Sequence, residues 1–280
     1  MSVLAATALV AGVAGCSSTQ GQPDVPAAPA TPRVPADIIL PFDAYDVTPQ
    51  VQRVENDAYR ELVSRCAAGY GVDLVMPAAE VPVETNARRY GLFDADRARS
   101  QGYVGTTVFL DEVRAGEWRP SALQKYVLTG ESRPPGAPAV PAGGCARRSE
   151  QELGLPDATM ADVSAAGRST FDQAAADPGV RAAEQRWSAC LATQGLHYAR
   201  TFDPSNQPWT QPRGSAQELR TATADVRCKQ TTNLVGAWLA AEAALQRRLI
   251  ENDPEAFAAL RSWHEARLAR ARGVLDGAEG

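Results

Sequence analysis

Residues that commonly bind metals or act in catalysis are scarce in this sequence. It contains two histidines, two lysines and three methionines among 280 residues. His197 and His264 each lie far in the sequence from a second soft ligand, and no Cys-x-x-Cys pair occurs. Zinc sites need such ligands at short spacings, so we expect no metal site. We interpret His197 as a loop residue and His264 as part of the solvent-exposed face of a helix.

The sequence also lacks the motifs of several large enzyme classes. It has no Gly-x-Ser-x-Gly elbow, no Gly-x-x-x-x-Gly-Lys loop, no Gly-x-Gly-x-x-Gly after a strand and no His-Glu-x-x-His. Acidic pairs such as Asp94 and Asp96, or Asp111 and Glu112, do not stand out because acidic residues are common throughout the chain. We assign no catalytic and no cofactor-binding residue. A glycan-acting enzyme that uses two distant carboxylates remains open as an alternative.

The sequence also has no excess of basic over acidic residues. The formal net charge is −5 and the isoelectric point is about 5.2, which argues against nucleic acid as a partner. Hydrophobic residues make up 44% of the chain, a proportion typical of a folded globule rather than a disordered or polytopic membrane protein.

The N-terminus has the pattern of an export signal. Residues 3–13 form an apolar run that is too short to span a bilayer. The run ends in Val13-Ala14-Gly15-Cys16, which resembles the bacterial lipobox, although no basic residue precedes it. That resemblance implies a signal peptide over residues 1–15 and a diacylglycerol on the Cys16 thiol. We therefore expect a lipid-anchored protein on the outer face of the cytoplasmic membrane.

Residues 16–41 are predicted to form a proline-rich tether. Prolines occur at every third position from Pro23 to Pro35, which is the repeat of a polyproline II helix. At ~3.1 Å per residue this segment could reach on the order of 70 Å. A ligand for a proline-binding domain is the alternative interpretation of the same prolines.

The rest of the chain is predicted to be mainly α-helical, as a helical bundle with long Pro/Gly-rich loops. Helix caps or apolar stripes predict helices that begin near residues 49, 94, 121, 145, 178, 215 and 254. The helix from residue 215 is expected to continue to about residue 249. A short break at Asp253-Pro254 predicts that the last two helices form an antiparallel hairpin. Residues 104–110 are the best candidate for a strand.

The four remaining cysteines are expected to form two disulfides. Four cysteines allow three pairings, and an even number is typical of exported proteins. Each half of the chain has a cysteine helix, a long loop and a second cysteine helix. This repeated order favours two helix-loop-helix halves, 42–156 and 157–280, with the pairs Cys66–Cys145 and Cys190–Cys228. Two such units can also look alike by chance.

Short motifs resemble those of exported actinobacterial lipoproteins that have no assigned activity. One set runs from Trp187 and Cys190 through Gly195 and Tyr198 to Ala224-Asp225 and Cys228. A second set consists of Arg-Arg-Tyr-Gly at 88–91, Gln-Gly-Tyr at 101–103 and Gly-Gly-Cys at 143–145. The resemblance covers about residues 50–260 and implies a disulfide-linked helical protein of the envelope. Genes near some relatives hint at a role beside membrane transport. The resemblance implies no active site.

Aromatic residues in or near loops are the only binding signal. They are Tyr90, Tyr103, Trp118, Tyr198 and Trp209. Such rings could stack on sugars or on a partner protein, or they could close the ends of a small core. The sequence thus predicts a binding or scaffold protein of the cell envelope, with a transport protein, another envelope protein or cell-wall glycan as partner.

Overall fold

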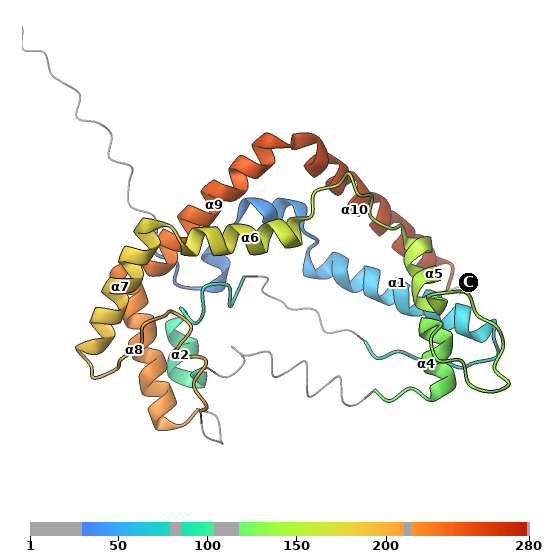
Figure 1. Ribbon diagram of the computed structural model, residues 1–280, viewed down its shortest axis with the longest axis horizontal. Helices are drawn as coiled ribbons and strands as arrows, with labels where there is room; N and C mark the ends of the chain where they lie inside the picture. Colours follow the sequence, from blue (N-terminus) through green and yellow to red (C-terminus); the bar gives the residue numbers. More distant parts are fainter. Residues whose placement is uncertain (1–29, 79–85, 104–117, 210–213, 279–280) are drawn as a thin grey trace, which may run out of the picture.

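The computed structural model describes residues 30–78, 86–103, 118–209 and 214–278, and these residues form a mainly α-helical protein (Figure 1). The expected fold class is confirmed. The described part of the chain contains no strand, and the candidate strand at 104–110 lies outside it. None of the described helices is both long and apolar enough to cross a bilayer.

The elements are η1 (Pro35–Asp37), η2 (Pro41–Tyr45), α1 (Pro49–Ala68), α2 (Ala95–Gln101), α4 (Ala122–Thr129), α5 (Gly144–Leu153), α6 (Val163–Ala175), α7 (Pro178–Ala192), α8 (Ala216–Thr232), α9 (Leu234–Asn252) and α10 (Pro254–Asp276).

The expected helix caps set the beginnings of several helices. The Thr48 hydroxyl accepts the Val51 N–H at 3.3 Å at the start of α1. Ser121 and Gln124 form a reciprocal capping box at the start of α4. Helix α6 was not expected, because alanine, serine and a central glycine give it only a weak apolar stripe. The helix expected over 215–249 is divided at Asn233, whose φ of 52° lies in the left-handed region.

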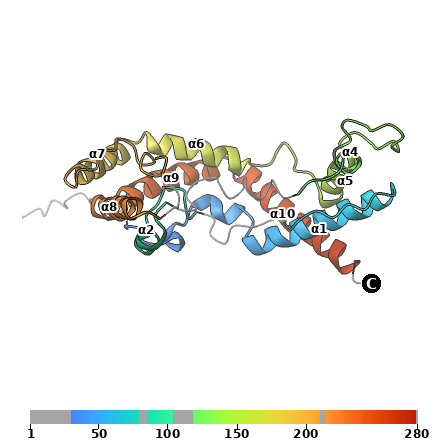
Figure 2. The same ribbon diagram turned by 90° about the horizontal axis from the view of Figure 1, so that it is seen from below.

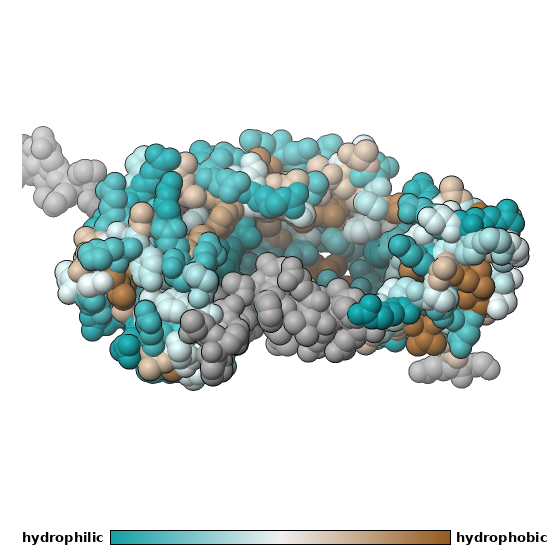
Figure 3. Space-filling model, turned by 60° about the horizontal axis from the view of Figure 1, so that its bottom comes forward, coloured by the Kyte–Doolittle hydropathy of each residue, from teal (hydrophilic) through white to brown (hydrophobic). Residues whose placement is uncertain are grey.

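The helices gather at the two ends of an elongated, arched molecule (Figure 1), and Figure 2 shows the same two groups from below. The first lobe consists of α1, α4, α5 and the C-terminal part of α10. The second lobe consists of α2, α6, α7, α8 and α9. Figure 3 shows that the surface is hollowed between these lobes. Each lobe has a core of its own, built around Val63 and Val127 in the first and around Trp187 and Trp238 in the second.

The lobes do not follow the predicted division of the sequence at residues 156 and 157. Helix α2 comes from the first half of the chain but packs against α8, and α10 comes from the second half but packs against α1. The N-terminal boundary also differs from the prediction, since Pro35, Ile38 and Leu40 of the expected tether are buried. The end of that segment therefore belongs to the folded body.

Helices α9 and α10 do not form the expected antiparallel hairpin. Asp253 alone links them, as C-cap of α9 and N-cap of α10, and its carboxylate accepts the Ala256 N–H at 3.1 Å. Reversal of direction between helices takes a loop of about 2–5 residues, so this link makes a bend instead. Helix α10 runs away from α9, and Figure 1 shows the bend at the top of the arch. Phe257 packs against Phe42 and Tyr45 just after the bend.

Both predicted disulfides are confirmed. Cys66 of α1 is bonded to Cys145 of α5, and Cys190 of α7 is bonded to Cys228 of α8. The Cα atoms are 5.7 Å apart in each pair. One disulfide therefore joins two helices within each lobe, and neither crosses between the lobes.

Candidate functional site

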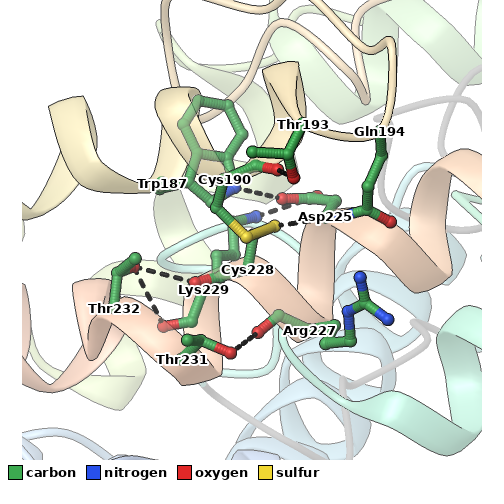
Figure 4. Close-up of a disulfide and its surroundings, with 10 residues drawn as sticks. All are labelled: Trp187, Cys190, Thr193, Gln194, Asp225, Arg227, Cys228, Lys229, Thr231 and Thr232. Carbon is green, nitrogen blue, oxygen red and sulfur yellow. Dashed lines mark hydrogen bonds and ion pairs between the residues drawn. A yellow bond between two sulfur atoms is a disulfide. The ribbon is translucent and has the colours of Figure 1, made fainter.

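A buried carboxylate, Asp225, organises the interior of the second lobe. It accepts hydrogen bonds from the indole N–H of Trp187 at 2.9 Å, the hydroxyl of Tyr103 at 3.0 Å and the ammonium of Lys229 at 3.1 Å. Figure 4 shows Asp225 beside Trp187 and Lys229, linked to both by dashed lines, next to the disulfide. The side chains of Asp225 and Lys229 are each only 1% exposed. The ammonium also donates to the Leu92 carbonyl at 2.9 Å, so the buried charge has both a counter-charge and a second acceptor.

A second buried carboxylate, Glu242 of α9, lies nearer the middle of the molecule. Its side chain has no exposed surface, and it pairs with the guanidinium of Arg89. Tyr90 donates its hydroxyl to the same carboxylate at 2.8 Å, and Gln246 donates its amide at 3.0 Å. Arg89 also donates to the Gly167 carbonyl at 2.9 Å. The network thus ties the segment before α2 to both α6 and α9.

The two tyrosines of these networks remain protonated donors. Burial and the neighbouring carboxylate both raise the pKa of Tyr90 and that of Tyr103 well above the usual range for tyrosine. A phenol held in this state is a hydrogen-bond donor to Glu242 or Asp225 and is not a base. The networks position helices, and they offer no free catalytic group to a substrate.

The central groove is a cavity of about 690 Å³ between η2 and α6, beside Glu242. Phe42, Asn86, Arg89, Gly167 and Phe171 line it together with Gln246. The Gln246 amide oxygen accepts the Phe42 N–H at 3.0 Å, while its NH₂ donates to Glu242. The floor of the groove is therefore fixed by the same network that holds Arg89.

The central groove combines apolar walls with a mostly acidic rim. Leu40 and Phe171 contribute apolar surface, and Asp46, Asp172 and Arg168 bring charges to the lining. The Arg89 guanidinium is neutralised by Glu242. A cavity of this volume falls in the range of small-molecule and peptide sites, and its few fixed polar groups would orient a ligand.

The structure buries part of the set of loop aromatics. Tyr90 and Tyr103 have no exposed surface, so neither ring has a face to offer to a ligand. Trp118, Tyr198 and Trp209 are partly buried and pack against the hydrophobic clusters of the two lobes. Trp209 stacks on Tyr103, with ring centroids 5.8 Å apart. The five rings do not share one surface, and none of them lines the central groove.

The glycines of the short sequence motifs have structural roles. Gly91, Gly102 and Gly144 all have positive φ angles. A Cβ at Gly102 would lie 3.0 Å from Glu218 Cγ, and one at Gly144 would lie 2.5 Å from the Leu128 carbonyl oxygen. The motifs at 88–91, 101–103 and 143–145 thus mark close approaches between elements.

The short sequence motifs contain Arg89 and Asp225, but sequence reasoning gave neither residue a role in the site and did not single out Glu242 or Lys229. Arg89 and Glu242 are 153 positions apart, so nothing in the sequence pairs them. Asp225 and Lys229 have the i, i+4 spacing of a helical ion pair, but that spacing is far more common on exposed faces. Their place among the apolar residues of α8 was the one available signal of burial.

Lipidation at Cys16 remains a prediction, because residue 16 lies outside the described residues. Within the described ranges, no three His, Cys, Asp or Glu side chains are grouped closely enough to hold a metal ion.

No protein-family model, curated protein or solved structure is similar enough to the chain to count as a match.

Proposed function

We propose that this protein is a lipid-anchored component of the outer face of the cytoplasmic membrane that binds or scaffolds other envelope molecules. The lipobox-like sequence before Cys16 and the two disulfides support this location, because disulfides persist in oxidising compartments. The observation that carries the binding role is the central groove, whose polar floor is fixed before any ligand arrives.

The groove is better suited to binding than to hydrolysis. A glycan-acting enzyme would need two carboxylates that are free to act on the substrate. Asp43 is occupied, because it accepts the Leu40 N–H at 2.8 Å and two contacts from the Asn86 amide. Glu242 is buried and paired with Arg89. Asp46 and Asp172 are the carboxylates that a hydrolytic alternative would use, and an Asp46→Asn/Asp172→Asn variant tests it on cell-wall glycan.

The groove fits a partner with an apolar portion and hydrogen-bonding or cationic groups. Phe42 and Phe171 offer apolar surface, while Asp46 and Asp172 favour positive charge at the rim. An exposed segment of an envelope or transport protein has this chemistry. A fixed floor reduces the ordering cost of binding such a segment.

Filling the groove tests the proposal. Gly167 lies in α6, and a Cβ there would have no atom nearer than 3.9 Å, so Gly167→Phe places a ring in the groove. Gly273→Phe, on the exposed face of α10, is the matched control because its site is open. A photo-crosslinker at the exposed Ser164 reports on the groove, and one at the exposed Ser169 reports on the same helix outside it.

We expect a crosslinked adduct from position 164 in intact membranes, and we expect Gly167→Phe to abolish it. Gly273→Phe should leave the adduct in place, and position 169 should give none. Equal adducts from both positions, or an adduct that persists in Gly167→Phe with an unchanged melting temperature, would contradict a ligand in the groove.

A further inference from the structure

A second groove lies on the outer side of α8, away from the central groove. We call it the arginine groove, defined by Arg99, Arg220, Arg227, Gln194, Leu196 and Tyr198. Helix α8 contributes Arg220 and Arg227, the segment after α7 contributes Gln194, Leu196 and Tyr198, and α2 contributes Arg99. Its volume is about 840 Å³, which is larger than a bare phosphate ion needs.

The charge of this groove is opposite to that of the protein as a whole. The chain has a net charge of −5, yet the described residues that line the groove include three arginines and no carboxylate. Arg220 and Arg227 are exposed and have no acidic partner among the described residues. Arg99 pairs with Asp96, three positions earlier, but both side chains are largely exposed and such a pair contributes little stability.

The arginines of α8 lie on the same side of the helix. Arg220 and Arg227 are separated by two turns, or roughly 10 Å along the axis, so both flexible side chains can reach one ligand between them. Figure 4 shows Arg227 and Gln194 on one side of the Cys190–Cys228 disulfide, with Trp187 on the other side. With 3.6 residues per turn, Asp225 lies on roughly the opposite side of α8 from Arg220 and Arg227, so the groove opens away from the buried Asp225 network.

Covalent and hydrogen bonds fix the walls of the groove. The disulfide holds the end of α7 against α8, and the Gln194 amide donates to the Cys228 sulfur at 3.4 Å. The Ser188 hydroxyl donates to the Tyr198 carbonyl at 2.6 Å. These bonds keep the apolar surfaces of Leu196 and Tyr198 beside the guanidinium groups. A ligand would therefore meet a preformed apolar wall, toward which the flexible arginine side chains can move.

We propose that the arginine groove binds a phosphate ester, with the phosphate between the guanidinium groups and the organic part against Leu196 and Tyr198. Guanidinium groups bind phosphate through paired hydrogen bonds, and several of them together match the negative charge of a phosphate ester, which is about two for a monoester and one for a lipid diester. The ester is either a soluble molecule or the headgroup of an anionic lipid. This inference is independent of the ligand in the central groove.

The test uses the full chain carrying Cys16→Ser, so that an acyl anchor cannot drive membrane binding. One arm titrates glycerol 3-phosphate by calorimetry. The other arm sediments the protein with vesicles of equal parts phosphatidylcholine and phosphatidylglycerol, compared with phosphatidylcholine alone. The groove variant is Arg220→Gln/Arg227→Gln. The control variant, Arg247→Gln/Arg248→Gln, removes the same charge from exposed positions of α9 that do not line the groove.

We expect the groove variant to weaken binding of at least one probe by roughly tenfold or more, since a hydrogen bond to a charged group is worth that much. The control variant should change the affinity for the probe by less than about twofold. The groove variant and the control variant should both have the melting temperature of the parent protein. Loss of glycerol 3-phosphate binding alone assigns a soluble ester, and loss of vesicle binding assigns a lipid headgroup. Failure of both probes to bind, or equal losses in the two variants, would overturn the proposal.

Discussion

Trp187 donates its indole N–H to the carboxylate of Asp225 across the interface of α7 and α8, at 2.9 Å and without solvent access. The disulfide between Cys190 and Cys228 lies beside this bond (Figure 4). A covalent bond and a charged network therefore hold the same pair of helices. The network also reaches Tyr103 at the end of α2, which the disulfide does not touch.

Neutralising Asp225 should strongly destabilise the second lobe. Asp225→Asn leaves the buried ammonium of Lys229 without its counter-charge, and breaking such a pair costs ~3–5 kcal/mol of unfolding free energy. The control variant Asp172→Asn, on the exposed face of α6, should change the free energy of unfolding by less than about 0.5 kcal/mol. Urea unfolding followed by circular dichroism measures both. The double variant Asp225→Asn/Lys229→Met removes the buried charge and keeps an amide oxygen that can accept from Trp187 or Tyr103, so it should recover part of the loss. A single variant as stable as the parent would contradict a structural role for the pair.

Stability should fall at alkaline pH because of the buried tyrosines. The folded-state pKa of Tyr90 and that of Tyr103 are raised above the unfolded value of about 10. The folded protein therefore retains phenolic protons that the unfolded chain releases. The free energy of unfolding is unaffected by these groups below about pH 10 and falls above it, by up to about 1.4 kcal/mol per pH unit for each tyrosine.

Urea unfolding between pH 8 and pH 11 checks this dependence. Tyr103→Phe removes one titrating group, so its stability should decline less steeply above pH 10 than that of the parent, even though its stability at pH 8 is lower. Parallel curves for the two proteins would show that Tyr103 ionises as easily in the folded state as in the unfolded chain.

Local patterns in the sequence predicted the disulfides and most of the helices, but not α6, the division at Asn233 or the lobes. Thr48 and Ser121 mark helix starts because a cap acts within three residues of itself. Local patterns do not show which helix another helix packs against. Phe257 and Leu260 show that α10 needs an apolar neighbour, and nothing in their spacing says whether that neighbour is α9 or α1. The one-residue link at Asp253 decided it through backbone geometry.

The candidate site was harder to predict for a similar reason. Its groups come from segments that are distant in the chain, such as Arg89 and Glu242 for the central groove. The loop aromatics gave a misleading signal in part, because Tyr90 and Tyr103 are loop residues by sequence and core residues by burial. A tyrosine hydroxyl can be buried when a carboxylate accepts its hydrogen bond, and single-sequence patterns do not show that partner.

Two tryptophans should differ in their contribution to stability. Trp238 is 4% exposed and packs among Tyr90, Phe171 and Phe202, so Trp238→Ala should cost ~3–5 kcal/mol. Trp263 is only partly buried, although its indole N–H donates to the Gly154 carbonyl at 3.1 Å. Trp263→Ala should cost about 1–2 kcal/mol. Thermal melts of the two variants measure the difference, and the reverse order would mean that α10 supports the fold more than α9 does.

Cys16 should carry the membrane anchor. Cys16→Ser removes the thiol that would receive the diacylglycerol, so the variant should be released from membranes or retain its leader. Metabolic labelling with an alkyne fatty acid, followed by click detection, distinguishes the two proteins. Cys66→Ala/Cys145→Ala is the control, because those thiols form a disulfide and its label should persist. Equal incorporation in Cys16→Ser and the parent would refute lipidation at this residue.

The burial of Lys229 makes the folded protein unusually selective toward amine reagents. The sequence has two lysines, and both lie in the described part of the chain. Lys125 is exposed on α4, whereas the Lys229 ammonium is sealed within the second lobe. A succinimidyl dye should therefore mark the first lobe at one side chain without any engineered handle. Modification of Lys229 would follow only when the second lobe opens, so the mass of a tryptic peptide reports the opening rate of that lobe separately from the other.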